Sequence, residues 1–114
     1  MKKMLHCIAL LFATAVAQAA DVASVKCDVS RGLETMQLSF LVDANTGKSY
    51  VIGNAGQAEV TFIRNKGGGL TFIEVTPTGN VATTTLDDSG RAVHSRNMII
   101  AGELTPSQYL GRCR

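Results

Sequence analysis

The chain has 114 residues, of which 46% are hydrophobic, and its formal charge at pH 7 is +2. This length accommodates one domain, so it excludes a two-domain dinucleotide enzyme and a long repeat array. The positive charge at first favours an anionic partner, but two of the lysines lie in the first three residues.

The first nineteen residues have the three-part pattern of a secretory signal peptide. Lys2 and Lys3 give a positive start, the stretch 5–16 is apolar apart from two residues, and Ala17-Gln18-Ala19 ends it with small residues. The apolar stretch is about a dozen residues long, whereas a membrane span needs roughly 20. We therefore expect a signal peptide over 1–19 and one β domain over 20–114. After cleavage the protein would be periplasmic or secreted, with no stable membrane anchor.

Removal of this signal changes the charge. Without Lys2 and Lys3, nine Lys and Arg balance nine Asp and Glu, so the mature chain is neutral. It also has no basic stripe interleaved with aromatic residues, and we expect no nucleic-acid partner. Four arginines gather toward the C-terminus, where they form either a modest basic patch for an acidic partner or a set of separately solvated side chains: Arg91, Arg96, Arg112 and Arg114.

Cys27 and Cys113 are the two cysteines that remain after the signal is removed. An even pair in an exported chain predicts a disulfide, here one that joins the first strand to the last. A metal site made of these two cysteines and His94 is the alternative, but the chain lacks the C-x-x-C and H-x-x-x-H spacings that favour one. We expect no metal and no other cofactor.

Alternation of apolar and polar residues predicts short strands along the mature chain. It is clearest in two apolar faces: Met36, Leu38, Phe40 and Val42, and Ala58, Val60 and Phe62. Further strands are predicted over 70–75, 81–86 and 93–104. The breaks at 43–47, 53–56, 65–69, 77–80 and 87–90 are rich in Gly, Asn and Asp and recur about every ten residues. The fold class is therefore all-β: an antiparallel meander of about seven short strands that forms a small barrel or sandwich, with its ends joined by the disulfide.

The segment Thr105-Pro106-Ser107-Gln108 is predicted as one helical turn. Thr105 is a suitable N-cap, and proline is favoured at the first helical position. This turn would deliver Tyr109 and Leu110 against the sheet.

His94-Ser95-Arg96-Asn97 is the most polar stretch inside a predicted strand. One interpretation makes His94 a general base. On a strand, however, Ser95 points to the opposite face, so the adjacent pair is not a nucleophile and its base. We favour the other interpretation, a strand face that meets solvent or a partner, with His94, Arg96 and Asn97 as a possible binding surface and no catalytic residue.

A small hydrolase would need partners for His94 from elsewhere in the chain. The candidates are Ser89 or Ser107 as nucleophile and Asp87 or Asp88 as orienting carboxylate, and no G-x-S-x-G element supports them. The same Asp87-Asp88 pair offers oxygen ligands to a hard cation. Because the spacing of a calcium loop is missing, an ordinary hairpin turn is favoured.

Two resemblances carry further expectations. The stretch from Gly69 to Cys113, with TFIEVTPTGNVATTT, AVHSRN and PSQYLGRC, resembles small exported bacterial β-proteins of unassigned function. In outline, Cys27-Asp28 and the late Cys113 are similar to the bacterial inhibitors of c-type lysozyme, which are small exported β-barrels. Those inhibitors insert a loop with a Ser-Gly-x-x-Tyr-like motif into the lysozyme cleft.

The segment Thr46-Gly47-Lys48-Ser49-Tyr50 is similar in form to that motif, with threonine in place of serine and a shorter distance from the first cysteine. The resemblance thus implies a binding role for Lys48 and Tyr50. The family's tryptophan-containing segment has no counterpart, because the chain has no tryptophan. The expected function is a non-catalytic exported module that binds a protein or a cell-envelope component. The alternatives are an inhibitor of a lysozyme-like enzyme and, third, the small hydrolase.

Overall fold

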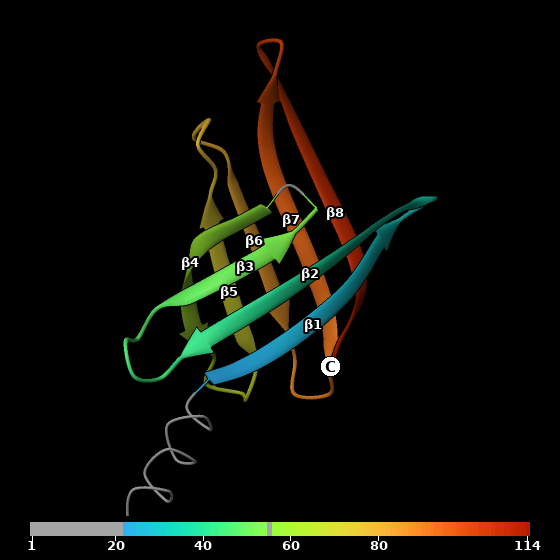
Figure 1. Ribbon diagram of the computed structural model, residues 1–114. Helices are drawn as coiled ribbons and strands as arrows, with labels where there is room; N and C mark the ends of the chain where they lie inside the picture. Colours follow the sequence, from blue (N-terminus) through green and yellow to red (C-terminus); the bar gives the residue numbers. More distant parts are fainter. Residues whose placement is uncertain (1–21, 55) are drawn as a thin grey trace, which may run out of the picture.

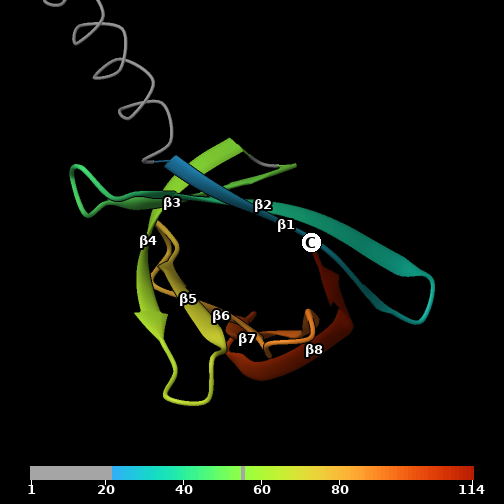
Figure 2. The same cartoon turned by 90° about the horizontal axis from the view of Figure 1, so that it is seen from below.

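The computed structural model describes residues 22–54 and 56–114, and the predicted signal peptide lies outside them. The strands are β1 (Val22–Arg31), β2 (Glu34–Asp43), β3 (Ser49–Gly53), β4 (Gly56–Arg64), β5 (Leu70–Val75), β6 (Val81–Leu86), β7 (Arg91–Ile100) and β8 (Glu103–Cys113). They form one closed antiparallel barrel in chain order (Figures 1 and 2). The predicted all-β meander is confirmed, and it is a barrel, not a sandwich. Among the described residues no helix could cross a membrane.

The barrel has eight strands where the sequence predicted about seven, because the predicted strand 93–104 is two strands. A two-residue turn at Ala101 and Gly102, both with positive φ, separates Ile100 from its cross-strand partner Glu103. Turns of this kind match the right-handed twist of the strands that they join.

The helical turn predicted at Thr105–Gln108 is wrong, since these residues belong to β8. The Cys113 N–H donates to the Gly90 carbonyl on the β7 side, whereas Arg114 exchanges hydrogen bonds with Lys26 on the β1 side. Because backbone groups alternate along an antiparallel strand, the nitrogen of Pro106 faces away from β7. Its missing N–H therefore removes no hydrogen bond from the β7–β8 ladder.

The inward faces of the strands fill the barrel. Phe72 is 1% exposed, and its ring stacks on Phe40 and Phe62 with centroid distances of 4.1 and 5.3 Å. The two alternating faces predicted from the sequence both point inward. Burial of one large apolar side chain contributes about 1.5–3 kcal/mol, so this trio of aromatic rings is a major part of the core.

The barrel closes where β1 pairs with β8 over four residue pairs, and we call this contact the seam. Cys27 lies opposite Cys113 with a Cα–Cα distance of 3.9 Å, and the two form the predicted disulfide. The prediction that the disulfide joins the first strand to the last is confirmed. Such a bond is consistent with an oxidising, non-cytoplasmic location.

The two ends of the barrel differ. At the hairpin end, defined by the turns 32–33 and 101–102, the β1–β2 and β7–β8 hairpins continue beyond the seam and diverge (Figure 1). The loop end is defined by the loops 44–48, 65–69 and 87–90, and the C-terminus lies there as well. The candidate sites fall at these two ends.

Candidate functional site

The five residues predicted as a binding surface lie in separate parts of the barrel. Lys48 and Tyr50 belong to the loop end and to β3, and the Lys48 Nζ lies 3.8 Å from Glu59 Oε1. Ser49, between them, is 2% exposed and points inward. Asn97 is exposed on β7, on the far side of the barrel from β3 in strand order. No single surface joins these residues, and their roles in binding stay predictions.

His94 lies inside the barrel with 4% of its surface exposed. The prediction that it meets solvent is wrong, because the inward side of β7 carries Ala92, His94 and Arg96. Its Nδ1 atom is 2.7 Å from Thr84 Oγ1. Burial, followed by the nearby charge of Arg96, lowers the pKa of His94 to about 4, so the ring is neutral at pH 7.

The proposed hydrolase constellation is not brought together in the described part of the chain. The hydrogen-bond partner of His94 is the threonine on β6, and the Ser89 hydroxyl donates instead to Asp87 at the loop end. The cavity beside His94 has a volume of about 10 Å³, which is room for about one water molecule. The barrel interior beside His94 is thus closely packed.

Side chains from β1, β2, β7 and β8 meet at the hairpin end in what we call the Tyr109 cluster: Arg31, Glu34, Arg96 and Tyr109. The Tyr109 hydroxyl donates to Glu34 Oε2 at 2.8 Å, and Arg31 Nη2 lies 3.1 Å from Glu34 Oε1. Both guanidinium groups lie near the tyrosine ring, at 5.4 Å for Arg31 and 5.3 Å for Arg96. These contacts connect the two diverging hairpins just above the seam.

The cluster has an uneven charge balance. The Tyr109 hydroxyl, followed by the Arg31 guanidinium, lowers the pKa of Glu34. Arg31 is therefore neutralised by Glu34, whereas Arg96 has no ion-pair partner within 22–54 and 56–114. The Arg96 Nε is buried without a hydrogen-bond partner, and one Nη contacts the Met36 sulfur at 3.8 Å. An unpaired, partly buried guanidinium favours an incoming carboxylate.

Large apolar side chains are exposed at the tips of both hairpins. The exposed fractions are 102% for Leu33, 82% for Leu104, 63% for Ile99 and 51% for Ile100. A single exposed leucine is ordinary, but both tips, which point in different directions (Figure 1), carry large exposed apolar side chains, and each tip is therefore a candidate contact surface. Sequence reasoning missed these tips, because isolated exposed leucines carry no signal and the Tyr109 cluster that connects the two hairpins forms only when β8 closes on β1.

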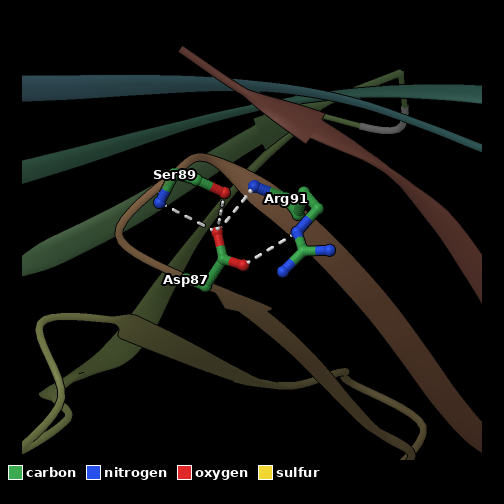
Figure 3. Close-up of polar contacts among 3 residues, drawn as sticks. All are labelled: Asp87, Ser89 and Arg91. Atoms are coloured by element: carbon green, nitrogen blue, oxygen red, sulfur yellow. Dashed lines mark hydrogen bonds and ion pairs between the residues drawn. The ribbon is translucent and has the colours of Figure 1, made fainter.

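At the loop end, Asp87 organises the turn between β6 and β7 (Figure 3). Its Oδ1 accepts from the Ser89 N–H and hydroxyl and from the Arg91 N–H, and its Oδ2 accepts from Arg91 Nε at 3.0 Å. The Ser89 hydroxyl and the Arg91 groups together lower the pKa of Asp87 to about 2. The favoured interpretation of 87–90 as a hairpin turn agrees with this geometry.

Within the described residues, no three His, Cys, Asp or Glu side chains are grouped to hold a metal ion. Comparisons of the chain with protein-family models, with curated proteins and with solved structures find no match.

Proposed function

We propose that the protein is a non-catalytic exported module that binds a protein partner of the cell envelope through its hairpin end. The observation that carries this proposal is the exposure of Leu33 and Leu104, at 102% and 82%, on the tips of two hairpins held together by the Tyr109 cluster. Each Å² of such apolar surface that a partner removes from water contributes about 25 cal/mol of favourable free energy, before the costs of association.

The Tyr109 cluster supports the same surface. Arginine and tyrosine are the residue types that most often dominate the energy of protein interfaces. Their side chains are already placed here by the ion pair with Glu34 and by the two contacts of guanidinium groups with the ring. A partner with an apolar patch beside an acidic side chain would cover the tips and neutralise Arg96, and such complementarity sets specificity more than affinity.

The test is a recovery experiment with matched variants. The tagged protein, with its disulfide intact, is cross-linked in a periplasmic extract, and the partner is identified and purified. Leu33→Ser with Leu104→Ser should weaken binding of that purified partner at least tenfold. Ile63→Ser, which alters a 43% exposed residue at the far end of β4, should leave it unchanged. Equal binding by both variants would contradict a role for the hairpin end.

Inhibition of a lysozyme-like enzyme is the second candidate, and the exposed loop 44–48 favours it. The Lys48 side chain is 59% exposed at the end of this loop, with Glu59 Oε1 3.8 Å from its Nζ, and an exposed cation that can exchange partners suits a glycosidase cleft built around two carboxylates. In a turbidity assay the protein should protect cell-wall substrate from lysozyme, and Tyr50→Ala or Lys48→Ala should weaken the protection while Lys66→Ala does not. No protection at micromolar protein would remove this candidate.

A further inference from the structure

A shallow hollow of about 660 Å³ lies on the outer wall at the loop end, where β7 and β8 approach the seam. Its size is within the range of about 300–1,000 Å³ that small-molecule sites occupy. We call it the Val93 groove, and its lining residues are Thr85, Asp87, Arg91, Ala92, Val93, Leu110, Gly111 and Arg112. It lies away from the hairpin end and is independent of the function proposed above.

The floor of the Val93 groove is aliphatic. Val93 and Leu110 are cross-strand partners, 38% and 61% exposed. Two apolar side chains directly opposite each other form a continuous patch, since their Cβ atoms are about 5 Å apart in such a pair. This patch is large enough to cover a short alkyl chain but has no aromatic ring on which a sugar could stack.

One end of the groove is basic. Arg91 and Arg112 are cross-strand partners two residues along from the Val93–Leu110 pair, so the four side chains share the outer face. Like charges placed directly opposite each other destabilise a sheet. Arg112 has no ion-pair partner in the part of the chain that the structure describes, and Asp87 neutralises only Arg91. Asp28 lies opposite Arg112 across the seam, but its Oδ2 is 3.9 Å from Arg114 Nη1, so the three arginines face two carboxylates. A net positive charge is therefore left beside the apolar floor.

Arg91 is held in place before any ligand arrives. Asp87 fixes its Nε at 3.0 Å, and Asp87 itself is held by the Ser89 N–H and hydroxyl. Figure 3 shows both Nη groups of Arg91 without a bond to the residues drawn, and the side chain is 74% exposed. A guanidinium that is oriented through Nε keeps its terminal N–H groups for an oxyanion.

We propose that the Val93 groove binds a small amphipathic carboxylate, with its head on Arg91 and Arg112 and its alkyl chain on Val93 and Leu110. An anion would offset the repulsion between the two arginines, and the chain would cover apolar surface that is otherwise in water. Planar carboxylates match guanidinium groups in geometry as well as charge.

The probe is octanoate, titrated below its micelle concentration into the isotope-labelled protein with its disulfide intact. Amide shifts should be concentrated at Val93, Leu110 and Arg112, with a dissociation constant below about 1 mM. Octyltrimethylammonium, which has the same chain length but a cationic head, and acetate, which has no chain, should each bind at least about tenfold more weakly. Equal binding of the carboxylate and the ammonium compound would overturn the proposal.

Two variants separate the head from the chain. Arg112→Gln should weaken octanoate about tenfold, and its control Lys66→Gln removes one positive charge at the same end outside the groove. Leu110→Ser should weaken octanoate but leave acetate unchanged. If Arg112→Gln and Lys66→Gln weaken binding equally, the attraction is diffuse and the proposal fails. Binding to anionic phospholipid vesicles with no response to octanoate would also reject it, in favour of a membrane surface.

Discussion

Gly111 of β8 lies opposite Val29 of β1, and the backbone of β1 occupies the space that a side chain at position 111 would need. A Cβ atom at this position would meet the Asp28 carbonyl oxygen and would lie 2.7 Å from the Val29 Cα. The seam therefore depends on a residue without a side chain, because only then do the first and last strands approach closely enough to pair.

Gly111→Ala in β8 should destabilise the barrel far more than a glycine-to-alanine change in a loop where the added Cβ meets nothing. The added methyl group meets backbone, which cannot move aside as a flexible side chain can, so we expect a loss of about 3 kcal/mol in the free energy of unfolding. Urea denaturation measures it. Gly67→Ala is the control, since a Cβ there meets nothing within 4 Å and the backbone has an ordinary φ. Equal midpoints for the two variants would refute the steric argument.

The disulfide should contribute a large part of the stability. Cys27 and Cys113 are 86 residues apart, and a loop of this size is worth about 4–5 kcal/mol in the chain-entropy treatment. Cys27→Ala with Cys113→Ala should therefore lower the melting temperature by about 15 °C or more for a domain of this size. Reduction of the unaltered protein should give a similar decrease. An unchanged melting temperature in oxidising buffer would show that the bond is unimportant.

The alternating faces of β2 and β4 were predictable from the sequence because a period of two residues, set by the pleat, is a local property. The helical turn predicted around Pro106 is wrong because the conformation there is not a local property. Whether a proline interrupts a strand depends on which neighbour its nitrogen faces, and that is decided by the pairing of β8 with β7 and β1. The burial of His94 likewise depends on the register of β7, since a shift of one residue would place it outside.

The site at the hairpin end could not be predicted from the sequence. Tyr109 and Glu34 are 75 residues apart, and neither stands in a motif that points to the other. Their contact exists because β8 returns to β1 in a closed barrel, which places the two long hairpins at one end. The exposed Leu33 carries no signal of its own, because isolated leucines are common on protein surfaces.

His94 should make the protein less stable in mild acid. Its pKa is about 4 in the folded chain against 6.5 in the unfolded chain, so the unfolded state binds more protons between these values. The stability that the neutral ring contributes is fully present above pH 6.5 and is lost as the pH falls toward 4. The free energy of unfolding falls by on the order of 2 kcal/mol over this range.

Urea denaturation at pH 7, 6 and 5 measures this loss, and His94→Gln should flatten it. The carboxyl groups of Glu34 and Asp87 have lowered pKa values from ordinary values of 4.5 and 3.8, so their contributions are lost mainly below this range. A slope in the glutamine variant equal to that of the unaltered protein would assign the effect to other groups.

Tyr109→Phe should raise the pKa of Glu34 toward its ordinary value of 4.5. The hydroxyl of Tyr109 is the largest cause of the lowered value, and Arg31 remains in the variant, so part of the shift should persist. Carboxyl resonances followed by NMR during an acid titration measure the change. Tyr50→Phe removes the other tyrosine hydroxyl, on β3, and should leave Glu34 unaffected. Because the bond from Tyr109 also connects the two hairpins, amide exchange at Glu34 should become faster in Tyr109→Phe alone. If Glu34 titrates identically in both variants, the two hairpins are not joined through this hydroxyl in solution.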